Sequence, residues 1–167
     1  MEEQTETSEN AESRAPTGGL FGISSAVAIF TGALLLFLVQ PIMSKMILPW
    51  FGGAPNVWTT CMLFFQTVLV LGYLYAHILA TRLKPKNQFV LHCLLLAVSA
   101  LSLPILVKES WKPEGGEDPV LQILMLLSAT VGLPYFLLSS TGPLVQSWFA
   151  ARLPGQSPYR LYALSNV

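Results

Sequence analysis

The sequence predicts an all-α polytopic membrane protein with about four transmembrane helices. Only 11% of its 167 residues are charged and 53% are hydrophobic, whereas a typical soluble domain is about 25% charged. Four stretches contain no Asp, Glu, Lys or Arg: 15–44, 46–81, 87–107 and 120–151. Each is long enough to supply the about 20 helical residues that a bilayer core of about 30 Å requires. Soluble helices usually carry a polar face, and these stretches show none.

Residues 1–19 indicate a disordered acidic tail. Five of the nine acidic residues fall within the first twelve positions, and the segment contains no aromatic residue. A secretory signal would begin with basic residues, so we expect the first apolar helix to remain in the mature protein. Residues 20–167 are predicted to form one transmembrane helical domain.

The apolar pattern places the four helices at 20–40, 57–80, 89–106 and 120–140. Pro41 is expected to bend or end the first helix, because proline removes a helical hydrogen bond. The fourth helix is expected to be kinked or broken, since Gly132-Leu133-Pro134 and Thr141-Gly142-Pro143 interrupt it. A short segment at 144–150 would follow near the membrane interface.

The Lys and Arg residues near the helix ends predict the orientation. Six lie on the side of the N-terminus, the 82–88 loop and the C-terminus, and three lie on the other side: Lys45, Lys108 and Lys112. Cytoplasmic loops carry an excess of Lys and Arg. We therefore expect a multi-pass protein of the plasma or inner membrane with a cytoplasmic N-terminus.

The motifs of common enzymes and binding proteins are missing from the sequence. It contains no GxGxxG and no P-loop, and Asp118 is its single aspartate. Cys61 and Cys93 fall in apolar stretches, where buried free thiols are expected, and they form no metal-ligand pattern. The formal net charge of zero offers no basic face for nucleic acid. The sequence therefore predicts no catalytic, cofactor-binding or metal-binding residue in this chain.

Polar residues at membrane depth mark the places where function is most often found. The candidates are Gln40, Lys45, Gln66, Ser139, Ser140, Thr141 and Gln146. One hypothesis is that Gln40, Lys45 and Gln66 line a polar cavity between helices. The alternative is that Lys45 extends to the headgroups while the glutamines bond neighbouring helices. His77 and His92 fit interfacial polar residues better than a proton relay.

Small residues on the second helix predict close packing. Gly72, Ala76 and Ala80 are four residues apart, a spacing that lets helix backbones approach closely in lipid. This face is a candidate for helix–helix self-association, although Gly and Ala are also common in such helices by chance.

Residues 37–77 carry a resemblance to a known family. They are FLVQPIMSKMILPWFGGAPNVWTTCMLFFQTVLVLGYLYAH, and further matching elements lie in 133–148 and 158–166. The chain resembles fused transporter-like/spermidine synthase proteins, in which a Major Facilitator-like membrane region precedes a polyamine aminopropyltransferase-like domain. The resemblance covers most of the chain after residue 20, and it comprises only the membrane region.

The resemblance implies a membrane part of a polyamine-biosynthesis protein. The full-length relative would transfer an aminopropyl group in a later domain, whose Gly-rich loop and aspartates have no counterpart here. The chain is therefore expected to be a fragment that stops where another helix should start. It would act as an anchor or bind a polyamine or another small solute. The alternatives are a transporter component that uses Gln40, Lys45, Gln66 and the break in the fourth helix, and a structural scaffold.

Overall fold

The computed structural model describes residues 17–52, 55–101, 103, 111–113 and 118–152. Within these residues the chain is helical and contains no strand. The elements are α2 (Thr17–Ile47), α3 (Pro55–Arg82), α4 (Pro85–Ala100), α5 (Pro119–Leu127), the π-helix η2 (Ser128–Gly132) and α6 (Leu133–Arg152). The predicted all-α fold is confirmed, with four helical bodies: α2, α3, α4 and the run from α5 through η2 to α6.

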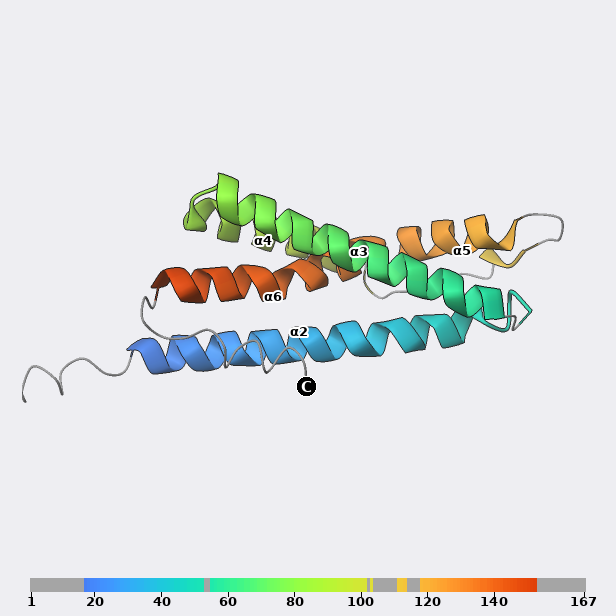
Figure 1. Cartoon of the computed structure of the whole chain (residues 1–167), viewed down its shortest axis with the longest axis horizontal. Coiled ribbons are helices and arrows are strands. Elements are labelled where there is room, and N and C mark those ends of the chain that lie inside the picture. The colour runs from blue at the N-terminus through green and yellow to red at the C-terminus, as the bar shows by residue number, and fades with distance from the viewer. Residues whose placement is uncertain (1–16, 53–54, 102, 104–110, 114–117, 153–167) are drawn as a thin grey trace, which may run out of the picture.

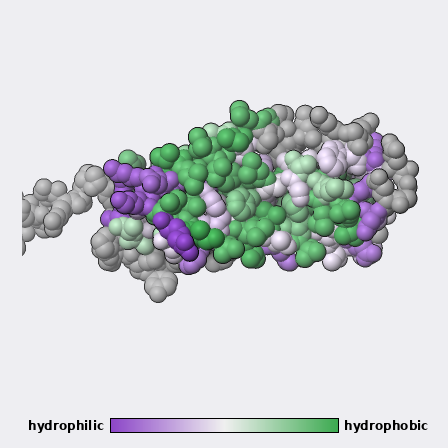
Figure 2. Space-filling view, turned by 90° about the horizontal axis from the view of Figure 1, so that it is seen from above, coloured by the Kyte–Doolittle hydropathy of each residue, from purple (hydrophilic) through white to green (hydrophobic). Residues whose placement is uncertain are grey.

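Three helical runs are long and apolar enough to cross a membrane: Gly19–Ile47, Pro55–Arg82 and Pro119–Arg152. The described part of α4 has 16 residues, which corresponds to about 24 Å of helix and falls short of a bilayer core. Figure 2 shows a broad apolar band over the middle of the molecule, with hydrophilic residues gathered at its two ends. That distribution is typical of a protein whose middle faces lipid.

The helices run up and down along one long axis (Figure 1). Helix α6 is central, since it contacts α2, α3 and α4, and its most extensive contact is with α3. Helix α3 also packs against α5, at the end of the bundle away from α4. The up-down order brings residues that are far apart in sequence to the same end of the molecule.

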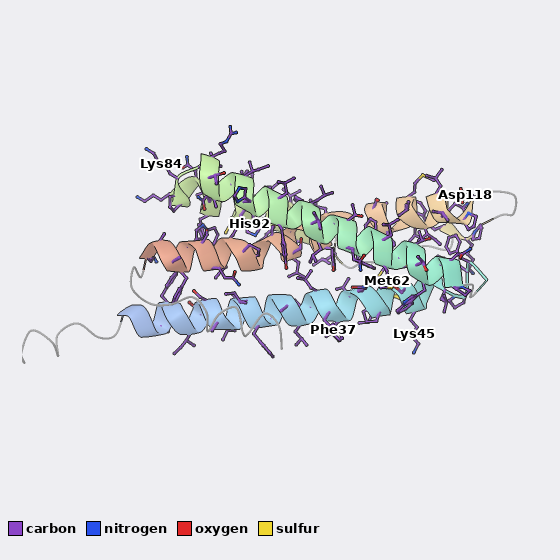
Figure 3. The ribbon with its side chains drawn as sticks, viewed as in Figure 1. Phe37, Lys45, Met62, Lys84, His92 and Asp118 are labelled. Atoms are coloured by element: carbon purple, nitrogen blue, oxygen red, sulfur yellow. The ribbon has the colours of Figure 1, made fainter. Side chains whose placement is uncertain are left out.

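The described charges separate between the two ends. Lys84, in the short connection between α3 and α4, lies at the opposite end from Lys45 and Asp118 (Figure 3). Arg82 and Arg152, the last residues of α3 and α6, belong to the Lys84 end. We call this end the basic end. The grouping agrees with the one used to predict orientation, although Arg14, Lys108 and Arg160 lie outside the described residues.

Pro41 does not end the first helix, which was one of the two outcomes predicted for it. Helix α2 continues through it to Ile47. A proline costs one N–H donor, so the carbonyl of Phe37 loses its usual partner four residues later. Membrane helices tolerate this loss where neighbouring groups compensate. The Ser44 hydroxyl donates to a different carbonyl, that of Gln40, at 2.8 Å, so it does not replace the bond that Phe37 loses.

The fourth helical run is interrupted once rather than twice. The π-helix η2 at Ser128–Gly132 ends just before Pro134, near the first of the two predicted interruptions. A π turn carries an extra residue and changes the rotation between the flanking segments. The second predicted break, at Thr141-Gly142-Pro143, is wrong, because α6 runs through Pro143 to Arg152 without ending.

Two other predicted boundaries shift. Helix α4 begins at Pro85 rather than 89, because proline is favourable at the first helical position, where its missing N–H has no partner to lose. Its predicted end at 106 lies outside the described residues, and Leu103 is not helical. Helix α2 begins at Thr17, so the predicted tail of 1–19 is too long by three residues, and residues 1–16 are not described.

Gly72 confirms the close packing expected of small residues. Gly72 and Ala76 are buried, whereas Ala80 is exposed. A Cβ built on Gly72 would overlap the Ser139 hydroxyl and would lie 2.9 Å from the carbonyl oxygen of Phe136. Two of the three small residues are therefore used for the α3–α6 contact within one chain. Self-association through this face stays a prediction.

Candidate functional site

A cavity of about 540 Å³ lies between α2, α3 and α6. Its α2 residues fall at the middle of that helix, between Ile29 and Gln40, so the cavity is at membrane mid-depth. The lining residues are Ile29, Gly32, Ala33, Leu36, Phe37, Gln40, Leu69, Tyr73, Tyr135, Leu138, Ser139, Gly142, Pro143 and Gln146. They come from segments separated by up to about a hundred residues of sequence, which only the tertiary fold brings together.

The cavity exists because large side chains hold α2 and α6 apart at both ends. At the basic end Phe21 stacks on Phe149, with ring centroids 6.3 Å apart. At the other end Met43 and Ile47 pack in a core cluster that also contains Tyr135. Between these contacts the lining includes three small residues, Gly32, Ala33 and Gly142, and nothing lies within 4 Å of a Cβ added to either glycine. The space between the helices is therefore left open.

Two half-buried amides provide the main polar groups of the cavity. The side chains of Gln40 and Gln146 both line it. Neither side chain forms a hydrogen bond to another described residue; Gln40 takes part only through its main-chain carbonyl. Each amide offers two donors and an acceptor. Unpaired amides at membrane depth are costly, so this pair favours a polar occupant.

The prolines add main-chain acceptors to the same place. Pro143 lines the cavity and leaves the Ser139 carbonyl without its usual donor, because residue 143 has no N–H. Pro41 does the same for the carbonyl of Phe37, another lining residue. Both carbonyls therefore lack their helical donor, and each belongs to a residue that lines the cavity.

Aromatic rings form part of the remaining wall. Tyr135 is 4% exposed and its ring meets Phe65 edge-to-face at 4.8 Å, which fixes its position. Tyr73, which is 50% exposed, lies at the rim. The lining residues include no Asp, Glu, Lys or Arg. The arrangement can bind a small polar molecule through hydrogen bonds and ring faces, and it has no cation to hold an anion.

Only some of the residues of the predicted polar site line the cavity. Gln40, Ser139 and Gln146 line the cavity. Lys45 and Gln66 do not line it: both are exposed, Lys45 near the end of α2 and Gln66 on the outward face of α3. Of the three residues in the polar-cavity hypothesis, this cavity contains Gln40 but neither Lys45 nor Gln66. The outward position of Lys45 fits the alternative in which it extends toward the headgroups (Figure 3).

Ser140 and Thr141 serve other contacts. The Ser140 hydroxyl donates to the Leu137 carbonyl at 2.9 Å and is fully buried. Thr141 donates to the same carbonyl at 2.8 Å and lies 3.1 Å from Nε2 of His92. Since the Thr141 hydroxyl proton is used, His92 must donate through Nε2. His92 therefore joins α4 to α6.

On α4, His92 also lies close to Tyr75 of α3. It is 2% exposed, and its ring centroid is 6.1 Å from that of Tyr75 on α3. His92 Nδ1 and the Tyr75 hydroxyl are buried and have no hydrogen-bond partner among the described residues. His92 is therefore buried between α4 and α6, and its place at the membrane interface stays a prediction.

Gln88 forms the second polar link between α4 and α6. Trp148 Nε1 donates to Gln88 Oε1 at 2.7 Å, and Gln88 Nε2 donates to the Leu83 carbonyl at 2.7 Å. Gln88 and His92 are one helical turn apart on α4. Sequence reasoning passed over Gln88, yet its spacing from His92 was a signal that one face of α4 is polar.

The described part of the chain offers no candidate metal site. No cluster of three or more His, Cys, Asp or Glu side chains occurs there. Cys61 is buried and Cys93 is exposed, and both are free thiols. The cavity between α2, α3 and α6 is therefore the principal candidate site. Comparison of the chain with protein-family models, with curated proteins and with solved structures gave no match.

Proposed function

We propose that this chain is the membrane region of a spermidine synthase-like protein and that its central cavity binds a small amine. The cavity supports the second part of the proposal, because Gln40 and Gln146 line it beside the middle of α2 and neither side chain has a hydrogen-bond partner among the described residues. The family assignment is supported by the resemblance in residues 37–77 and 133–148. The attached enzyme, in this proposal, lies outside the present chain.

An amine fits this cavity better than an anion does. Ammonium groups donate hydrogen bonds, and the cavity supplies amide and main-chain oxygens to accept them. The rings of Tyr73 and Tyr135 can add cation–π attraction. Anions are held most strongly by Lys or Arg, and neither occurs in the lining.

Binding of spermidine and putrescine to the purified chain in nanodiscs tests the proposal. We expect spermidine to bind and a dicarboxylate of similar length not to bind at the same ionic strength. Gln146→Leu or Gln40→Leu should weaken spermidine binding by about three- to tenfold, the loss expected for one hydrogen bond. Gln66→Leu is the matched control, because it removes the same amide from the outward face of α3. An equal loss in all three variants, or no spermidine binding, would contradict an amine site.

A transporter component is the second candidate, and the position of the cavity favours it. Transporter binding sites lie near the bilayer midplane between helices, and the cavity lies beside the middle of α2, between α2, α3 and α6. Uptake of radiolabelled spermidine into proteoliposomes separates the two candidates. Uptake that disappears in Gln146→Leu indicates transport, whereas binding without uptake indicates a sensing or anchoring role. A scaffold would show neither.

The family proposal has its own test, which does not depend on solute binding. Sequencing the coding region beyond Val167 should reveal further apolar spans and then a Gly-rich strand–turn–helix with aspartates. Their absence would contradict the assignment to a spermidine synthase-like protein, and the proposal that the cavity binds an amine would be unaffected.

A further inference from the structure

A second pocket, of about 450 Å³, lies at the basic end between α2, α4 and α6. Its walls are the rings of Phe21, Phe89 and Trp148, and its charged groups are Lys86 and Arg152. It shares no lining residue with the central cavity. The amine proposal therefore leaves this pocket unexplained.

The walls of this pocket are fixed by contacts. Trp148 donates to Gln88 at 2.7 Å and meets Phe89 edge-to-face, with ring centroids 5.7 Å apart. The Arg152 guanidinium carbon is 5.1 Å from the centre of the Phe21 ring. The aromatic faces and the arginine are thus held in place before any ligand arrives, which reduces the entropy lost on binding.

The charge of the pocket is not neutralised within the described residues. Asp118 is the only acidic residue among them, and it lies at the opposite end of the molecule (Figure 3). Arg82 and Lys84 are close in sequence to the α4 residues of the pocket and add to the positive potential. The pocket therefore favours an anion.

The apolar walls decide which kind of anion fits. A free phosphate would use Lys86 and Arg152 and leave three aromatic faces uncovered. A phospholipid would use both parts, because its phosphate can pair with the cations while its glycerol and acyl chains cover Phe21 and Phe89. The pocket also lies at the end of its helices, since Pro85, Lys86 and Phe89 belong to the start of α4 and Trp148, Ala151 and Arg152 to the end of α6. The end of a membrane helix is the depth of a lipid headgroup.

We propose that the pocket formed by Phe21, Lys86, Phe89, Trp148 and Arg152 binds the headgroup of an anionic phospholipid. Basic pockets between membrane helices hold anionic headgroups on the cytoplasmic side, which is the side predicted for this end of the chain. The bound lipid would join α2, α4 and α6 at their common end.

Lipid retention by the purified chain tests this site. The 167-residue chain is equilibrated with equal amounts of phosphatidylglycerol and phosphatidylcholine in detergent, and the retained ratio is measured by mass spectrometry. Phosphatidylglycerol should be enriched. The double variant K86Q/R152Q should lower the enrichment by about fivefold for each cation removed.

The double variant R82Q/K84Q is the matched control. It removes the same charge from the same end, but neither residue lines the pocket. The enrichment should persist in this variant. An equal loss in both double variants would mean diffuse attraction to the surface and would overturn the proposal. So would full competition by inorganic phosphate at the same concentration as the lipid, since that outcome indicates a free-anion site.

A second measurement does not depend on the cation variants. Phosphatidylglycerol with brominated acyl chains should quench tryptophan fluorescence more strongly than brominated phosphatidylcholine. This additional quenching by phosphatidylglycerol should disappear in Trp148→Phe. The variant keeps an aromatic wall and leaves Trp50, Trp58 and Trp111 as internal references. Persistence of the full excess in Trp148→Phe would place the lipid elsewhere and refute the site.

Discussion

Gly72 on α3 lies directly against Ser139 on α6, so closely that a Cβ on Gly72 would overlap the Ser139 hydroxyl. The contact is formed where the chain makes its most extensive helix–helix interface. Ser139 also lines the central cavity. The close approach at Gly72 therefore helps to set the position of one wall of the candidate site.

Gly72→Ala should destabilise the chain. The added methyl group meets Ser139 and also the Phe136 carbonyl oxygen at 2.9 Å, which is main chain and cannot rotate away. Overpacking of this kind costs about 1–3 kcal/mol, and unfolding in mixed micelles measures it. Gly32→Ala is the control, because nothing lies within 4 Å of its added Cβ. It should be neutral or stabilising, since alanine is the better helix former.

A second substitution sharpens this test. Adding Ser139→Ala to Gly72→Ala removes the hydroxyl but leaves the Phe136 carbonyl and the Ser139 Cβ, which would lie 3.1 Å from the new methyl group. We expect partial recovery of stability. Full recovery would mean that the main-chain contact imposes no cost.

Thr141→Val should weaken the contact between α4 and α6. The substitution keeps the side-chain shape but removes the hydroxyl that accepts from His92 Nε2 at 3.1 Å. Interhelical hydrogen bonds in membrane proteins contribute about 0.6 kcal/mol on average and up to about 1.7, so we expect a loss in that range. Thr67→Val is the control, because its exposed hydroxyl bonds only to the Leu63 carbonyl of its own helix.

The hydrogen bond between His92 and Thr141 also predicts which nitrogen of the imidazole ring carries the proton. Nitrogen-15 NMR should find the His92 proton on Nε2, because Thr141 uses its own hydroxyl proton on the Leu137 carbonyl. The tautomer preference should weaken in Thr141→Val. A proton on Nδ1 in the unsubstituted chain would show that the His92–Thr141 bond is absent.

Deletion of Ala129 should disrupt the packing of α6. Removing one residue from η2 would let the segment become α-helical and would rotate α6 by about 100° relative to α5. Tyr135 and Ser139 would then leave their buried positions, so a loss of more than about 3 kcal/mol is expected. Ala129→Leu is the control, since residue 129 is exposed and the substitution keeps the register. Equal stability of the two variants would mean that the π turn has no role in placing α6.

Cysteine labelling tests the orientation. In a background without Cys61 and Cys93, Lys84→Cys should be protected from an impermeant maleimide in intact cells, and Lys45→Cys should react. The two residues lie at opposite ends of the bundle (Figure 3). The reverse pattern would place the N-terminus outside, and labelling of both would contradict the described separation of the ends.

The elements of this protein could be predicted largely from composition, because lipid imposes simple requirements on length and charge. Helix α3 was placed within two residues at each end, since no charge interrupts 57–80 and no proline lies inside it. Boundaries failed where proline was taken as an interruption. Pro41 and Pro143 lie within continuous helices, and Pro85 begins one. Whether a proline is tolerated inside a membrane helix depends on the groups packed around it, and local sequence does not reveal those groups.

The candidate site could be predicted only in part. Gln40, Ser139 and Gln146 were recognised as polar residues at membrane depth, and they line the cavity. Lys45 and Gln66 satisfied the same criterion and yet face outward. The criterion measures depth along a helix, whereas a site also requires the correct rotation about it. Helices that are apolar all round provide little information about rotation, because no polar face distinguishes lipid from protein.

The sequence alone therefore determined the all-α membrane fold, since a chain with so few charges must satisfy its main-chain hydrogen bonds within helices. It also determined the separation of charge between the two ends. Only the tertiary structure decided which residues share a cavity. Contacts such as Gly72 with Ser139 and Phe21 with Phe149 set the rotation and spacing of the helices, and these contacts join residues too distant in sequence for local pattern to relate them.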